Sequence, residues 1–232
     1  LDASYKGSGK LQIKLNKKYQ FVKQPEIGTM VSFAYTMYEN HGFKFTDCEQ
    51  IYIENVDVYV AGGMGIRMDR GNDFYFNRFN FMNKEGSSRI MTCTADIVHA
   101  CAVAGELKIT NSILEGSHDD ALNIKSFYGK VSSVVPALKE IEIVQTQTEV
   151  TIPFEKGDKI DIYNPETMGF VDSYIIEELK KNGTGYIVTV DKRPDRNIVE
   201  YSVGNDTKST HLTLNNCLIR NKRNRGILLQ VR

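Results

Sequence analysis

The sequence predicts an all-β fold, a right-handed parallel β-helix (β-solenoid) with a small β-barrel inserted into it. Three observations support this prediction: an internal repeat, a fixed interval between short alternating segments, and a long interruption with a different pattern. A solenoid stacks coils whose strands pair with those of the next coil, so a constant period is expected in its sequence. The right hand follows the general rule for crossovers between parallel strands.

The repeat begins at His41, after about 40 residues without a clear period. A shift of 23 residues places Gly42–Phe45 on Gly65–Met68, and Ile51–Asn55 on Phe74–Arg78, without gaps. Self-similarity at a fixed period indicates stacked coils rather than a sandwich.

Later coils keep the same spacing. An interval of 13 residues separates each of three pairs: Ile53 and Ile66, Ile109 and Leu122, Leu214 and Ile227. The residues expected to form a continuous inward column are Phe43, Ile66, Leu122 and Ile227. Asparagines recur at one corner, at Asn55, Asn111 and Asn216, and predict a structural ladder.

Two segments break the period. The interval from Phe76 to Ile97 is 21 residues, so that Phe81–Ser88 is expected to supply a loop of about eight extra residues beside the next coil. From about Lys130 to Thr207, alternating runs joined by glycine-containing turns predict the barrel. Within it, Tyr174–Lys181 contains good helix formers, and a short helix stays open there.

The predicted domains are therefore 1–129, β-helix coils with an Asp-rich site; 130–207, an inserted β-barrel; and 208–232, the β-helix continued. Because the sequence stops directly after a strand, we expect it to be part of a longer protein.

Composition excludes several classes. Lys plus Arg and Asp plus Glu both total 29, so no net field favours nucleic acid as a partner. No apolar run approaches the roughly 20 residues of a membrane helix, and the N-terminus has no signal-peptide character. The four cysteines lack Cys-x-x-Cys spacing, and we predict no metal and no cofactor. Oligomeric state is not indicated.

The candidate catalytic residues are Asp96, Asp119 and Asp120. Aligned coils place Asp96 in a column whose other members are almost free of side chains: Gly42, Gly65, Ala121 and Gly226. Strand spacing puts Asp96 about 8 Å from Asp119. That gap accommodates one water molecule, as in inverting glycoside hydrolysis. Neighbouring carboxyl groups also raise one another's pKa, so that one can be the acid while another is the base.

The polar side chains expected to bind substrate around these carboxylates are His99, His118, Asn123, Lys125, Arg223, Arg225 and Arg67. Imidazoles can bond to carboxylates or sugar hydroxyls, and arginine can hold a hydroxyl-rich substrate or steady a carboxylate. Plainer interpretations stay open, because Asp pairs are common in solvated turns and His99 can equally be a hydrogen-bonded corner residue.

In their order along the chain, these motifs resemble glycoside hydrolase family 110. The resemblance covers most of residues 41–232 and is carried by Asp96-x-x-His99, Asp119–Ile124, the inserted barrel and Asn221–Leu228, with Ala61–Gly65 fitting as well. It implies an exo-acting, inverting α-galactosidase that removes α-1,3-linked galactose from the ends of oligosaccharides or polysaccharides. It also implies the three aspartates as catalytic groups, and export to the periplasm or exterior.

Two departures affect the expected sugar and linkage but leave the carboxylates intact. Lys125 stands where the family usually has His, and Arg223-Asn224-Arg225 stands where it usually has Arg-Ala-Arg. We expect Asp96 to be the general acid and the Asp119–Asp120 pair to be the base.

Two other functions stay open. A pectinase-like inverting polygalacturonide hydrolase would use the basic residues to bind uronate, although the barrel and Ala61–Gly65 favour the galactosidase. A non-catalytic glycan-binding β-solenoid would bind sugar without turnover.

Overall fold

A computed structural model describes residues 2–14, 26–32, 37–146 and 153–231. The chain divides into two compact units, Leu1–Phe33 and Ala34–Arg232. In the described ranges the regular elements are strands, together with a short 3₁₀ turn, η2 (Arg196–Ile198). The all-β class is therefore confirmed. No helix of the described residues is long and apolar enough to cross a membrane.

The first unit contains an antiparallel hairpin of β1 (Asp2–Tyr5) and β2 (Leu11–Lys14). Its turn passes through Gly7 and Gly9, whose φ values of 80° and 73° are unstrained only for glycine. This hairpin supplies none of the predicted site residues.

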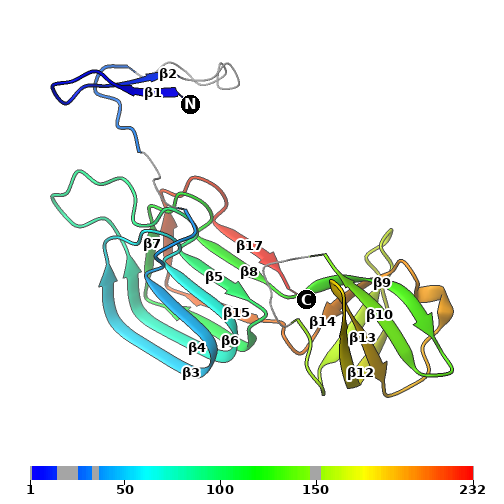
Figure 1. Cartoon of the computed structure of the whole chain (residues 1–232). Helices are drawn as coiled ribbons and strands as arrows, with labels where there is room; N and C mark the ends of the chain where they lie inside the picture. Colours follow the sequence, from blue (N-terminus) through cyan, green and yellow to red (C-terminus); the bar gives the residue numbers. More distant parts are fainter. Residues whose placement is uncertain (1, 15–25, 33–36, 147–152, 232) are drawn as a thin grey trace. The chain divides into compact units, whose positions relative to one another are not determined.

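The second unit contains a curled parallel sheet (Figure 1). The first coils are β3 (Phe43–Val58) and β4 (Ile66–Phe81), followed by β5 (Val98–Cys101), β6 (Ala104–Thr110), β7 (Ile113–Glu115) and β8 (Leu122–Lys125). The last coil consists of β15 (His211–Asn215), β16 (Leu218–Arg220) and β17 (Ile227–Gln230), which pair in parallel with β6, β7 and β8. Phe43 lies opposite Ile66, so the predicted repeat is confirmed as backbone register.

The inward column forms much of the core. Ile66, Val98 and Leu122 lie opposite one another on successive coils and are fully buried. Phe43 packs against this core from one side, and Ile227 remains 43% exposed at the other. Val98 takes the place that the sequence prediction gave to Ile97.

The corner ladder is confirmed. Asn55, Asn111 and Asn216 have φ values between 51° and 57°, the left-handed conformation that Asn tolerates better than most residues. Asn216 Nδ2 donates to Asn111 Oδ1 at 2.8 Å. In the second coil Arg78 stands at this corner, with φ 49°, and its Nε donates to Asn55.

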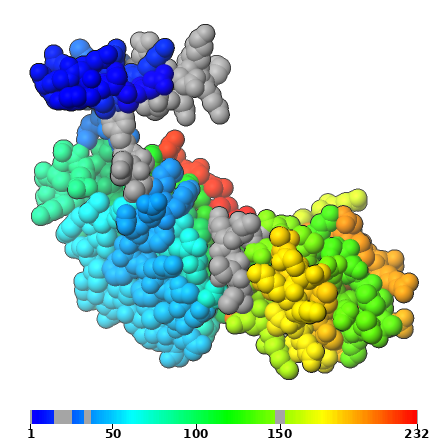
Figure 2. Space-filling model, in the orientation of Figure 1, coloured from blue at the N-terminus to red at the C-terminus, as the bar shows by residue number. Residues whose placement is uncertain are grey.

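The interruption folds as a closed antiparallel barrel with its own core; Figure 2 shows it as a separate packed mass. Its strands are β9 (Tyr128–Val135), β10 (Glu140–Gln145), β11 (Lys159–Tyr163), β12 (Phe170–Asn182), β13 (Gly185–Val190) and β14 (Ser202–Asn205). The helix considered for Tyr174–Lys181 is wrong, because these residues lie in β12. Tyr174 and Ile176 are buried at alternate positions, and pairing with β11 and β13 outweighs helix propensity.

The chain enters and leaves the barrel at one place. Ser126, directly after β8, donates its hydroxyl to the carbonyls of Asn205 (2.8 Å) and Lys208 (3.0 Å). Thr210 donates to the carbonyl of Val103 at 2.7 Å, and β15 then pairs with β6. Coil stacking therefore resumes on the coil that precedes the barrel.

We predict that Gly65→Ala destabilises the protein by about 1–3 kcal/mol, because a Cβ there would lie 2.6 Å from both the Ile97 carbonyl oxygen and the Phe81 ring. The matched control is Gly226→Ala, whose Cβ would meet nothing closer than 3.7 Å. Urea unfolding of the two variants measures the difference, and equal losses would show that close packing between coils does not limit this column.

Candidate functional site

The candidate site lies where β5, β8 and β17 begin. Backbone bonds fix its register: the Ile97 amide donates to the Asp120 carbonyl at 3.2 Å, and the Ala121 amide to the Arg225 carbonyl at 3.0 Å. Asp96, Asp120 and Arg225 thus occupy the same position on three consecutive coils.

This register corrects the sequence alignment by one residue. Ile97, not Asp96, shares a column with Gly65 and Ala121, because the loop before β5 is one residue longer than predicted. The glycines are needed for close stacking rather than for ligand approach. A Cβ at Gly42 would lie 2.6 Å from the Gly65 carbonyl oxygen.

The corrected register also shortens the distances between carboxylates. One carboxylate oxygen from each of Asp96, Asp119 and Asp120 lies within 4.8 Å of the others. The predicted separation of about 8 Å between Asp96 and Asp119 is therefore wrong, because it assumed the slipped register.

Asp96 is buried, with 3% of its surface exposed, and accepts several hydrogen bonds. His99 Nδ1 donates to Oδ2 at 2.8 Å, Asn123 Nδ2 donates to Oδ2 at 3.1 Å, and the Asp120 amide donates to Oδ1 at 3.0 Å. These bonds fix the carboxylate and place the imidazole proton on Nδ1 of His99. Two predicted binding residues, His99 and Asn123, thus bond directly to a predicted catalytic one.

Asp120 is the most buried of the three, at 1% exposed. Its Oδ1 accepts from the Arg225 backbone amide at 2.9 Å and from Arg225 Nε at 3.0 Å. The Asp120 carboxylate raises the pKa of Arg225 above its ordinary value. Oδ2 of Asp120 is buried without a hydrogen-bond partner among the described residues, so one acceptor oxygen is left for a ligand or water.

Asp119 is only partly buried. Its Oδ1 accepts from Asn224 Nδ2 at 2.9 Å, and its carbonyl accepts from the Asn224 amide at 3.3 Å. The sequence analysis did not select Asn224. The signal was available, because Asn224 precedes Arg225 as Asp119 precedes Asp120.

The remaining predicted binding residues lie around this centre. Arg223 donates from Nη1 to His118 Nε2 at 2.8 Å, so a neutral His118 carries its proton on Nδ1. Arg67 lies opposite His99 in the register and pairs with Asp69 at 2.7 Å. Lys125 is buried at the end of β8, opposite Cys101 and next to the barrel junction.

His41 was also missed. It lies one coil before Asp96, opposite Met64, whose amide donates to its Nδ1 at 3.2 Å. Burial and the nearby Arg67 lower its pKa. An imidazole thus extends the polar column beyond Asp96.

The three carboxylates are the group with ligand atoms close enough to share a metal ion in the described part of the chain. Three of their six oxygens already accept hydrogen bonds from protein donors at 3.1 Å or less, and one faces a guanidinium. The donor arrangement fits acid/base chemistry without a cation, as the sequence analysis expects.

Burial, and next the Arg223 guanidinium, lower the pKa of His118 below its ordinary value of 6.5. We predict that Arg223→Ala raises this pKa, while burial still holds it below 6.5. Because the unfolded chain then binds the proton more strongly than the fold does, stability falls as the pH drops below 6.5, and less so in the variant. NMR titration of the ring tests this. His41, whose pKa is lowered by burial, Arg67 and Lys44, should titrate unchanged, and an unaltered His118 would contradict the prediction.

No family model matches the chain. It is similar to curated proteins named alpha-1,3-galactosidase: form A of Shewanella woodyi (22% identity, 89% of this chain, 34% of that protein), form B of Akkermansia muciniphila (26%, 76%, 22%) and form A of Bacteroides thetaiotaomicron (26%, 69%, 29%). The chain spans about a third or less of these relatives.

Proposed function

We infer that this chain, which belongs with the α-1,3-galactosidases, carries the catalytic centre of an exo-acting glycosidase that removes terminal α-linked galactose, α-1,3-linked in the first place. The observation that carries this proposal is the convergence of Asp96, Asp119 and Asp120 on adjoining coils, with one oxygen of each within 4.8 Å of the others. The names of the relatives supply the sugar and the linkage.

In this proposal the curled parallel sheet is a right-handed β-helix, interrupted by the barrel domain at 130–207. Parallel pairing of every coil with the next supports the stacking. The resumption of β15 on β6 supports the barrel as an insertion. Action on external glycans would place the protein in the periplasm or outside the cell.

Asp96 and Asp120 are proposed to activate the water molecule. A general base must be anionic and must hold an acceptor oxygen toward the water. Asp120 has Arg225 as a counter-charge and an unpartnered Oδ2. Asp96 is held by His99 and Asn123, which orient its carboxylate beside the same space.

Asp119 is proposed as the general acid, which reverses the allocation expected from the sequence. It is more exposed than Asp96 and Asp120, so it can reach the oxygen of a glycosidic bond at the surface. Its side-chain partner is the neutral amide of Asn224 rather than a cation. A carboxyl group in that setting can hold a proton until the leaving group takes it.

The reaction follows from these roles. Asp119 gives its proton to the glycosidic oxygen while the bond from that oxygen to galactose C1 breaks, with its electrons passing to oxygen. Water attacks C1 and gives a proton to Asp120. The products are galactose and the shortened glycan, and proton exchange with solvent restores both carboxyl groups.

Inversion is proposed from the family resemblance. Inverting pairs commonly have carboxyl groups roughly 6.5–9.5 Å apart, and the oxygens here approach within 4.8 Å. Spacing alone therefore favours the shorter, retaining geometry, and the configuration of the product decides the point.

We predict that the protein releases galactose from an α-1,3-galactobioside and that NMR detects β-galactose as the first product. Polygalacturonate should not be cleaved, because Arg225 faces Asp120 and Arg67 faces Asp69 rather than a uronate. Cleavage of the uronate alone would replace the proposal with the pectinase-like function, and sugar binding without turnover would replace it with the binding module. Initial release of α-galactose would refute inversion.

A pair of substrates separates acid from base. Asp119→Asn should slow the galactobioside about 10²–10⁴-fold but largely spare an aryl α-galactoside, whose phenolate leaves without protonation. Asp120→Asn should slow both substrates, because each needs an activated water. Asn224→Ala is the control for loss of the Asp119 contact alone. If Asp96→Asn, rather than Asp119→Asn, spares the aryl substrate, the original allocation is correct.

A further inference from the structure

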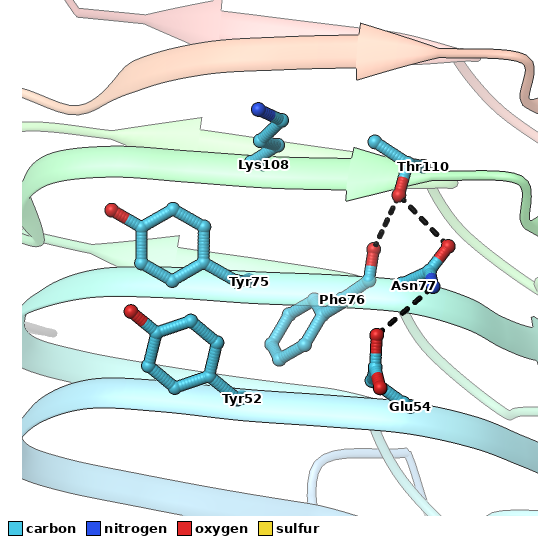
Figure 3. Close-up of a pocket in the computed structure, with 7 residues that line it drawn as sticks. All are labelled: Tyr52, Glu54, Tyr75, Phe76, Asn77, Lys108 and Thr110. Carbon is cyan, nitrogen blue, oxygen red and sulfur yellow. Dashed lines mark hydrogen bonds between the residues drawn. The ribbon is translucent and has the colours of Figure 1, made fainter.

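A second pocket lies on the outer face of β3, β4 and β6 and shares no residue with the candidate site. Its volume is about 330 Å³. The side chains that line it and matter here are Tyr52, Glu54, Tyr75, Asn77, Lys108 and Thr110 (Figure 3).

Coil register arranges these side chains in two columns. Tyr52, Tyr75 and Lys108 lie opposite one another on successive coils. Glu54, Asn77 and Thr110 form the second column, two residues further along each strand and therefore on the same face, roughly 6.6 Å away. Figure 3 shows the two tyrosine rings on one side and the polar column on the other.

The aromatic column is open to solvent. The rings of Tyr52 and Tyr75 stack with centroids 4.8 Å apart and an interplanar angle of 13°, and Tyr52 is 68% exposed. Stacking stabilises the two coils, but it leaves a broad apolar surface with both hydroxyls pointing the same way (Figure 3).

The polar column is pre-organised. Asn77 Nδ2 donates to Glu54 Oε1 at 3.0 Å, and Thr110 Oγ1 donates to Asn77 Oδ1 at 3.1 Å. For Glu54 Oε2 and the Lys108 ammonium group, the structure gives no bond to the described residues. One wall of the pocket thus offers ring surface, and the other offers fixed hydrogen-bonding groups.

We propose that this pocket is a non-catalytic binding site for a neutral glycan chain. The charges of Lys108 and Glu54 offset each other, so the pocket favours neither an anion nor a cation. Apolar ring faces beside oriented donors and acceptors match a sugar, which has C–H faces and equatorial hydroxyls. The site holds a glycan without cleaving it, and so goes beyond the proposed hydrolysis.

Affinity electrophoresis in gels containing a soluble neutral galactan tests the proposal, with dextran and polygalacturonate gels for comparison. The protein should be retarded by galactan, and Tyr52→Ala/Tyr75→Ala should weaken this binding about tenfold or more. Tyr5→Ala, which removes a tyrosine 71% exposed outside the pocket, should bind as the parent does. Galactobioside hydrolysis should be unchanged in both variants, so loss of binding is distinguishable from loss of the catalytic site.

A second variant guards against misfolding of the first. Tyr52→Phe/Tyr75→Phe keeps the stacked rings and removes only the hydroxyls, and should weaken binding severalfold with the thermal midpoint unchanged. Equal retardation of the parent and both double variants would overturn the proposal. So would stronger retardation in polygalacturonate than in galactan, or no retardation by galactan at all.

Discussion

Parallel pairing between the backbones of successive coils is the constraint on which the site depends. Side chains alternate between the two faces of a strand, so a slip of one residue would send an outward group into the core. The buried column of Ile66, Val98 and Leu122 prevents such a slip. The same register brings Asp96 and Asp120 to neighbouring coils, where Asp96 can accept the Asp120 amide. Apolar packing inside the solenoid thus sets the geometry of the acidic groups outside it.

Much of the fold could be predicted because the coils have equal lengths. A constant period fixes which residues lie opposite each other, and the corner asparagines mark where each coil bends. The enlarged coil could not be counted in this way, because the loop between Phe81 and Val98 has no second copy in the chain. That loop alone misplaced Asp96 by one residue, and with it the distance to Asp119. The candidate residues were right, whereas their separation needed coordinates.

Glycine shows a second limit of sequence reasoning. A column of Gly42 and Gly65 near a carboxylate fits both an open floor for a ligand and a tight contact between coils. Only the position of the Gly65 and Ile97 carbonyl oxygens decides between them. Asn224 shows the reverse case, since a residue noted only as a departure from the family pattern proves to bond to Asp119. A local motif gives the residue types, and the neighbouring coil gives their partners.

The junction of barrel and solenoid has an evolutionary consequence. Both chain crossings are tied together by Ser126, and β15 pairs with β6 as though no residues intervened. Mutations that lengthen, shorten or exchange the barrel therefore leave the alignment of Asp120 with Arg225 untouched. Selection can remodel this appendage freely while the reaction centre is inherited unchanged.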